Sequence, residues 1–179
     1  MTQVGTVYGE ALYELALSEG LDEAIRQELT VLEQAFREEP DYSRLLRSPN
    51  LSKAERCGIL DEAFRGRVQP YLLNFLKILV EKGYVGSFPQ CCAAFTRRYN
   101  EDHGILPVTA VTAVALTPEQ TAALTEKLSR ITGKTVALCN RVNPDVLGGV
   151  RLDYDGKRLD DTVSHRLESI HSLLKKDVL

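Results

Sequence analysis

The sequence predicts a mainly α-helical protein, with an N-terminal six-helix bundle in residues 1–104 and a small α/β domain in residues 105–179. Two observations lead to this prediction. Before Gly104, apolar residues recur every three or four positions, which is the spacing of amphipathic helices. After Gly104 they alternate with polar residues, as in half-buried strands, and a hairpin signal follows. This change of period places the domain boundary near Gly104.

The first three helices are delimited by glycine and proline. The first is expected over residues 4–19, before Gly20, and the second over residues 21–38. Glycine often follows a helix because it adopts the left-handed conformation without steric cost. Pro40 opens a short third helix, since proline is tolerated in the first turn. The main apolar stripe of the first helix is predicted to contain Val7, Tyr8, Ala11, Leu12, Leu15 and Ala16.

Three more helices complete the predicted bundle. Ser52 and Glu55 form a capping box, in which each side chain bonds the backbone N–H of the other residue, and this starts the fourth helix. The fifth is expected over residues 68–82, before Gly83, and the sixth over residues 89–103. Short connections favour antiparallel neighbours, so these helices are expected to pack as a bundle.

The second domain is predicted to begin with a strand, a helix and a second strand. One face of the first strand carries Leu106, Val108, Ala110, Thr112 and Val114. Thr117 and Gln120 form another capping box, and Pro118 suits the first helical position. This helix is expected to end at Gly133. The second strand is marked by Val136, Leu138 and Val142.

A hairpin and a final helix are expected after the second strand. Apolar and charged residues alternate over residues 150–154, which indicates a strand. Asp155-Gly156 is typical of a type I′ turn, whose two central residues both need positive φ, and residues 157–160 then return antiparallel. The final helix, capped by Asp161 or Thr162, is expected to carry an apolar stripe of Val163, Leu167, Ile170 and Leu174.

The composition disfavours several kinds of partner. With 22 basic and 25 acidic residues and a net charge of −3, the chain has no basic excess, so no nucleic acid is expected to bind. No signal peptide and no apolar run long enough for a bilayer are present, so no direct membrane insertion is expected. We expect a soluble protein of the bacterial cytoplasm. The 4 cysteines lack metal-binding or redox spacing and are expected to be reduced and mostly buried.

No motif predicts catalytic residues, a cofactor or a metal. Residues 132–135, Thr-Gly-Lys-Thr, resemble the end of a phosphate-binding loop, but the first glycine of that motif is missing and the run ends a helix. The acidic residues around Gly156 do not have the spacing of a calcium loop. The histidines are too far apart to chelate a metal from one helix face. A cysteine–histidine nucleophile pair formed by folding stays open, although no motif marks one.

Two helices carry more apolar residues than a bundle requires. In the fifth helix they cover about 220°, at 100° per residue, whereas a surface helix needs about half of that arc. The first helix adds Tyr13 and Leu17 opposite its main stripe. Either the fifth helix is central and buried on most sides, or the two helices form a groove for an amphipathic partner helix. The sequence leaves both interpretations open.

Three segments share a pattern with one known family. Residues 7–12, Val-Tyr-Gly-Glu-Ala-Leu, resemble its Tyr-Ala-x-Ala-Leu opening, and residues 74–83 resemble its fifth-helix signature. Residues 143–167 resemble its succession of Gly-Gly, Asp-Gly-Ser-Val and Arg-Leu. On these segments nearly the whole chain resembles the delta subunit of bacterial F-type ATP synthases, the homologue of the mitochondrial oligomycin-sensitivity-conferring protein.

The chain departs from the family pattern at three places. Gly9 replaces the usual alanine, which by helix propensity alone costs about 1 kcal/mol. Asp161-Thr162 stands where Gly-Ser is usual, but the capping hydroxyl is kept. Arg151 falls where an aliphatic residue is common, which indicates a more exposed strand.

The resemblance implies a stator subunit that clamps the catalytic alpha/beta hexamer to the b-subunit stalk during proton-driven ATP synthesis. The first domain would bind the catalytic head, with a groove between its first and fifth helices for the N-terminal helix of an alpha subunit. On that basis the groove residues are Tyr8, Ala11 and Ile78, extended by helical neighbourhood to Leu15 and Phe75. The second domain would hold the C-terminal end of the b subunits.

The same resemblance implies a non-catalytic, peripheral part of the synthase at the cytoplasmic face of the bacterial cell membrane, without a cofactor or metal. Two other functions stay open from the residues alone. One is an unrelated helical adaptor that binds an amphipathic partner helix. The other is an enzyme whose active site lies between the two domains.

Overall fold

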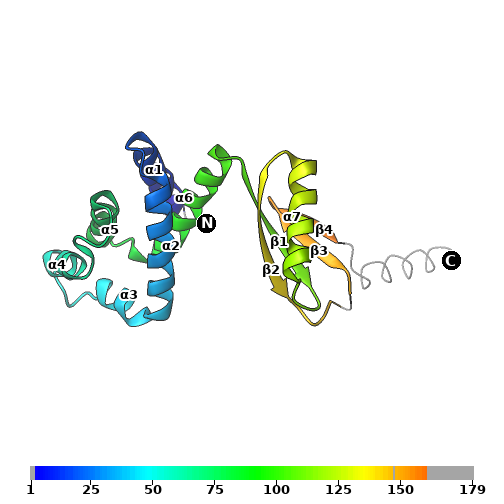
Figure 1. The fold of residues 1–179 in the computed structure, drawn as a ribbon. Helices are drawn as coiled ribbons and strands as arrows, with labels where there is room; N and C mark the ends of the chain where they lie inside the picture. The colour runs from blue at the N-terminus through cyan, green and yellow to red at the C-terminus, as the bar shows by residue number, and fades with distance from the viewer. Residues whose placement is uncertain (1–2, 147, 161–179) are drawn as a thin grey trace, which may run out of the picture. The chain divides into compact units, whose positions relative to one another are not determined.

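The structure is a computed structural model that describes residues 3–146 and 148–160. The chain divides into two compact units, Met1–Tyr99 and Asn100–Leu179. Helices form the first unit, and the described part of the second is a sheet with one helix (Figure 1). The fold class is therefore as predicted: the chain is mostly helical, with a helical N-terminal part and an α/β C-terminal part.

The helical unit has short connections throughout. Its elements are α1 (Gln3–Ser18), α2 (Asp22–Glu38), α3 (Pro40–Leu46), α4 (Lys53–Phe64), α5 (Pro70–Lys82), the 3-10 helix η1 (Val85–Ser87) and α6 (Phe88–Asp102). The largest shift from an expected bound is at α5, which begins at Pro70 rather than at residue 68. Gln69 is extended because Pro70 disfavours the helical conformation in the residue before it. The Gln69 N–H donates instead to the Glu28 carboxylate at 2.8 Å.

The helix ends follow the local chemistry of the sequence. Ser52 accepts a hydrogen bond from the Glu55 N–H at 3.2 Å and donates its own N–H to the Glu55 carboxylate at 2.8 Å, so the predicted capping box is confirmed. The second predicted box, Thr117 with Gln120, is confirmed as well. Gly83 caps the C-terminus of α5 in the left-handed conformation, with φ of 75°.

The predicted inward face of α1 is partly wrong. Its buried residues are Gly5, Gly9, Leu12, Tyr13 and Ala16. Tyr13 is a core residue, 1% exposed, whose ring meets Phe95 edge-on at 5.4 Å. In contrast, Val7 is 58% and Leu15 is 39% exposed. The reason is that two glycines, which an apolar pattern does not count, face α6 and let the two helices approach closely.

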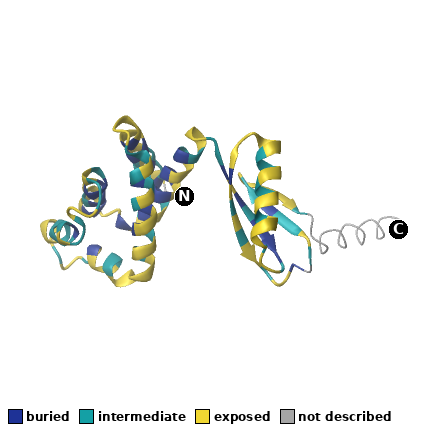
Figure 2. Cartoon of the chain, in the orientation of Figure 1, coloured by how far each residue is buried: buried dark blue, intermediate teal, exposed yellow. Residues whose placement is uncertain are grey.

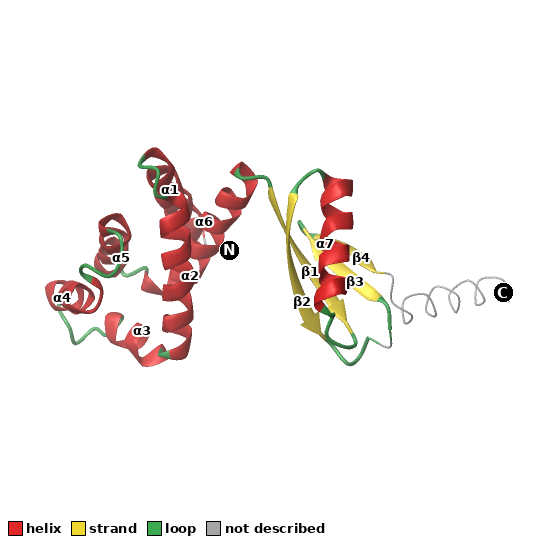
Figure 3. Ribbon diagram, viewed as in Figure 1, coloured by secondary structure: helices red, strands yellow, loops and turns green. Residues whose placement is uncertain are grey.

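The α/β unit contains a four-stranded sheet with one helix on one face (Figure 3). Its elements are β1 (Ile105–Thr112), α7 (Pro118–Thr132), β2 (Thr135–Val142), β3 (Val150–Tyr154) and β4 (Lys157–Asp160), in the sheet order β2-β1-β3-β4. β1 and β2 are parallel and joined through α7, whereas the other neighbours are antiparallel. α7 has no buried residue, and much of it is exposed (Figure 2). Its Leu124 and Leu128 are half-buried against the sheet core.

The hairpin of the α/β unit has the predicted type I′ character. Asp155 and Gly156 both have positive φ, 47° and 69°, between the antiparallel strands β3 and β4. Asn140 ties β2 to the loop after β1, because its amide donates to the carbonyl of Ala110 at 2.9 Å and accepts from the N–H of Leu116 at 2.9 Å. The final helix expected from the apolar stripe between residues 163 and 174 lies outside the described residues.

Candidate functional site

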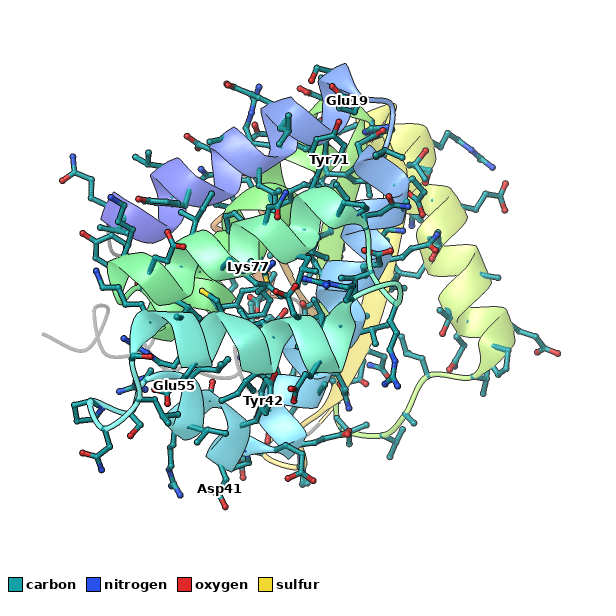
Figure 4. The ribbon with its side chains drawn as sticks, turned by 90° about the vertical axis from the view of Figure 1, so that its left-hand side faces the viewer. Glu19, Asp41, Tyr42, Glu55, Tyr71 and Lys77 are labelled. Carbon is teal, nitrogen blue, oxygen red and sulfur yellow. The ribbon has the colours of Figure 1, made fainter. Side chains whose placement is uncertain are left out.

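α1 and α5 pack antiparallel, and side chains at both ends fix this arrangement. At one end the Tyr71 hydroxyl donates to the Glu19 carboxylate at 3.0 Å, and Figure 4 shows the two residues together. At the other end the rings of Tyr8 and Tyr84 meet edge-on at 5.8 Å. This pairing places the Ile78 turn of α5 level with the middle of α1.

Apolar residues of α1 and α5 that the core does not use form an exposed strip. Tyr8, Ala11 and Leu15 follow one another at spacings of three and four residues, so they share one helix face. That face lies roughly 110° around α1 from the buried face, at 100° per residue. Ala11 is exposed, Tyr8 is half-buried, and Leu15 and Ile78 are 39% and 43% exposed. We call Tyr8, Ala11, Leu15 and Ile78 the α1–α5 strip.

Phe75, the fifth residue expected at the groove, belongs to the helical core. It is 6% exposed and lies about 60° around α5 from Ile78, at the edge of the buried face. The buried residues of α5 are Leu72, Leu73, Phe75, Leu76, Leu79 and Val80. Most of the apolar residues of α5 are therefore buried inside the chain's own core, and Ile78 is one that stays exposed.

Two exposed apolar residues beside the strip were missed as candidates. Val7, 58% exposed, precedes Tyr8 on α1, and Tyr84, 38% exposed, follows the cap residue Gly83 of α5. The sequence signal for Tyr84 was weak, because one aromatic residue after a helix end has no periodic partner. Its ring contact with Tyr8 shows that it extends the strip at this end of the helix pair.

Ion pairs between helices hold α1 and α5 in place. Arg97 of α6 donates to Glu10 of α1 at 2.6 Å. On the other side, Lys77 of α5 lies 2.7 Å from Asp61 of α4, which also pairs with Arg65 at 3.1 Å. The bond from Lys77, followed by that from Arg65, keeps the pKa of the Asp61 carboxyl below its usual value. These bonds brace the two helices that present the strip.

A second polar cluster joins α2 to α6. Glu23 accepts hydrogen bonds from Arg26, Tyr99 and Gln27, and together these lower its pKa to about 2. The Arg26 guanidinium lies over the Tyr99 ring, 5.0 Å from its centroid. The bond from Tyr99 of α6 to Glu23 of α2 links two helices, so the cluster is typical of a structural tie.

Three chemical features raised by the sequence are a metal cluster, a reactive thiol and a phosphate-binding loop. No three residues of His, Cys, Asp and Glu lie close enough to hold a metal among the residues described. Burial raises the pKa of Cys91 to about 11 and that of Cys92 further, which opposes thiolate formation. The Thr-Gly-Lys-Thr run ends α7 with Gly133 in the left-handed conformation, so it does not open a helix.

No helix within the described ranges is long and apolar enough to cross a membrane. The arrangement offers a braced pair of antiparallel helices with apolar side chains on one face, which is a surface that an amphipathic helix can bind.

Comparisons with known proteins connect the chain to one family. The family model described as ATP synthase delta (OSCP) subunit matches residues 4–174. The chain is 34% identical over 170 residues to the ATP synthase subunit delta of Gloeobacter violaceus, covering 94% of this chain and 92% of that relative. It is also 34% identical over 160 residues to the subunit delta of Carboxydothermus hydrogenoformans, with 89% and 90% covered.

Among solved structures, the fold is similar to a chain in the cryo-EM structure of the Toxoplasma gondii mitochondrial ATP synthase hexamer. The TM-score is 0.79 at 19% sequence identity, and 97% of this chain and 98% of that chain are covered. At this identity the likeness concerns the fold, and it extends over both units.

Proposed function

Because the chain belongs to the ATP synthase delta (OSCP) subunit family, we propose that it is the stator subunit that clamps the catalytic alpha/beta hexamer to the b-subunit stalk. The rotor exerts torque on the catalytic head, so the head needs a fixed attachment for proton flow to drive ATP synthesis. The proposed location is the cytoplasmic face of the bacterial cell membrane, as a peripheral part of the complex. The subunit itself contributes binding and stiffness rather than catalysis.

The single observation that supports the clamp best is the α1–α5 strip. Tyr8, Ala11 and Leu15 present one apolar face of α1, and Ile78 presents its counterpart on α5, all outside the core. A guest helix with apolar residues at spacings of three and four would cover both rows. We propose the N-terminal helix of an alpha subunit as this guest, with Phe75 forming the buried edge beside Ile78.

A stator requires tight and stiff attachment. Nanomolar affinity corresponds to about −12 kcal/mol, and burial of an apolar helix face can supply much of it. Stiffness is favoured by the ion pairs of Arg97 with Glu10 and of Lys77 with Asp61, which tie α1 and α5 to their neighbours. A surface held by its flanking helices loses less conformational entropy on binding than a mobile one.

The α/β unit is proposed to bind the C-terminal end of the b subunit. The division of the chain into two compact units, Met1–Tyr99 and Asn100–Leu179, supports separate attachment points. The proposed segments are residues 1–104 for the head and residues 105–179 for the stalk. Two linked contacts raise the effective concentration of each, so release of one leaves the subunit attached through the other. The family match also disfavours an unrelated helical adaptor, since it spans both units.

The test is a binding measurement with a peptide copied from the alpha-subunit N-terminus of the same organism. We expect nanomolar binding, read by fluorescence anisotropy, and a loss of at least 100-fold in Ile78→Asp, because the guest helix would bury the new charge against apolar side chains. Ile78 is 43% exposed, so the substitution should leave the fold intact.

Val31→Asp is the matched control, since Val31 is 68% exposed on α2 and does not belong to the strip. Binding of a peptide from the C-terminal end of the b subunit should be unchanged in Ile78→Asp. Absence of alpha-peptide binding at micromolar concentration, or equal losses in Ile78→Asp and Val31→Asp, would overturn the proposed site.

A further inference from the structure

A cavity of about 390 Å³ lies on the helical unit where α2, α3 and the segment from η1 to the start of α6 meet. Its volume falls within the range of roughly 300–1,000 Å³ that is typical of small-molecule sites. A compact cavity of this volume is roughly 9 Å across, so side chains on opposite walls can reach one small ligand. None of the lining residues belongs to the α1–α5 strip, so an occupant here is independent of the proposed clamp.

One wall of the cavity is apolar. The rings of Phe36 on α2 and Phe88 at the start of α6 have their centroids 5.0 Å apart. Phe36 is half-buried and Pro89 is exposed, so carbon atoms of both stay in contact with the cavity. This wall can pack against the apolar part of a ligand.

Two arginines and a serine line the polar part of the cavity. Arg37 follows Glu33 by four residues on α2, so the two share one helix face. Ser43 and Arg47 have the same spacing at the end of α3. The Arg47 guanidinium reaches across to η1, because its Nη1 atom lies 3.9 Å from the place that a Cβ of Gly86 would take. Since Gly86 lines the cavity too, the charged end of Arg47 lies at the cavity wall.

Positive charge exceeds negative charge among the described residues that line the cavity. Glu33 is the one carboxylate among them, and its Oε1 lies 3.3 Å from Nη2 of Arg37. This contact uses one of the five N–H donors of the Arg37 guanidinium. The Arg47 side chain makes no ion pair or hydrogen bond within residues 3–146 and 148–160, and the same holds for the Ser43 hydroxyl. These unused donors favour an acceptor that carries negative charge.

We propose that this cavity binds a small organic oxyanion with a carboxylate or phosphate head. The head would accept hydrogen bonds from Arg47, from Ser43 and from the remaining donors of Arg37, since the planar guanidinium fork matches both kinds of oxyanion. The apolar body would pack against Phe36 and Pro89. A cation would meet two guanidinium groups and one carboxylate that is already paired, and a neutral ligand would leave Arg47 without a counter-charge.

The experiment titrates the full chain with benzoate and with phenyl phosphate and follows backbone amide shifts by NMR. Benzyl alcohol and benzylamine are the matched neutral and cationic probes, since they keep the phenyl ring. We expect saturable shifts for both anions in α2, α3 and the start of α6, with a Kd on the order of 1 mM for ligands of this size. The alcohol should bind at least about fivefold more weakly, and the amine should not bind. The tighter of the two anions identifies the preferred head group.

Arg47→Gln should lower the affinity for both anions to that for the alcohol while leaving alcohol binding unchanged. Arg47 is exposed, so the substitution should leave the fold intact. Arg44→Gln is the matched control, since Arg44 lies on the same helix, pairs with Asp41 at 2.7 Å and does not line the cavity. Both variants remove one positive charge, so a general effect of net charge would be the same in both. Equal binding of benzoate and benzyl alcohol, equal losses in the two Arg→Gln variants, or shifts only elsewhere on the chain would overturn the proposal.

Discussion

Replacing Gly9 by alanine separates helix propensity from tertiary packing. By propensity alone, alanine in a helix interior is better than glycine by about 1 kcal/mol, so Gly9→Ala would stabilise α1. In the structure, a Cβ at this position would lie 2.3 Å from the carbonyl oxygen of Cys91 and 2.8 Å from the Cβ of Ala94. Both neighbours belong to α6 and neither can rotate away, so the two helices must separate.

The expected sign is therefore destabilising. Inserting a methyl group into a packed core costs about 1–3 kcal/mol, and the overlap with a backbone oxygen at 2.3 Å belongs to the upper part of that range, about 2–3 kcal/mol. The propensity gain offsets about 1 kcal/mol of it, which leaves a net loss of about 1–2 kcal/mol. For a unit of this size each kcal/mol corresponds to about 4–8 °C, so the Tm should fall by roughly 5–15 °C. Thermal unfolding of the full chain followed by circular dichroism measures this change.

Gly58→Ala is the matched control within the same chain. Gly58 lies inside α4, its added Cβ would meet no atom within 4 Å, and its φ is not positive. The same substitution should stabilise the protein there by up to about 1 kcal/mol. The reasoning about the α1–α6 contact fails if Gly9→Ala raises the Tm as Gly58→Ala does, because α1 would then have room for the methyl group.

Two further predictions concern a helix cap and an ion pair. Thr117→Ala should lower the free energy of unfolding of the α/β unit by about 1 kcal/mol in a urea titration, because α7 loses its capping hydroxyl. The control is Thr125→Ala inside α7, which should leave the free energy of unfolding unchanged or raise it. Equal losses in the two variants would contradict the cap assignment. In Asp61→Asn the free energy of unfolding should decrease less than in the unmodified chain as the pH is lowered. The pKa of Asp61 is lowered in the folded state, chiefly by Lys77, so its contribution is present above the unfolded value of about 3.9 and is lost as pH falls through the folded value. Urea titrations at several acidic pH values measure this dependence. If the Lys77–Asp61 pair contributed nothing, the free energy of unfolding would depend on pH in the same way in the variant and in the unmodified chain.

Features that depend on a few neighbouring residues could be predicted from the sequence. The capping box of Ser52 and Glu55 and the type I′ turn at Asp155 and Gly156 involve atoms within one turn of chain, so residue type decides them. The family resemblance likewise depends on the order of such segments, and the family match bears it out.

The faces of α1 could not be predicted in the same way. Its apolar residues surround much of the helix, so periodicity alone did not choose between Tyr13 and Leu15 for the core. The choice depends on Gly5 and Gly9, whose missing side chains let α6 approach. Close approach of helices distant in sequence is a property of the packed structure rather than of a local pattern.

Up to residue 160, the sequence by itself determined the order of the main helices and strands, the two capping boxes and the hairpin turn, and it also indicated the family, because each is set by short-range geometry or by residue order. Only the tertiary structure decided that Ile78 stays exposed beside Ala11 and Leu15 while Phe75 enters the core, since burial depends on which neighbour covers each side of a helix. It also brought Phe36, Ser43 and Phe88 together from three helices around one cavity. Side chains so far apart along the chain meet only when the helices pack.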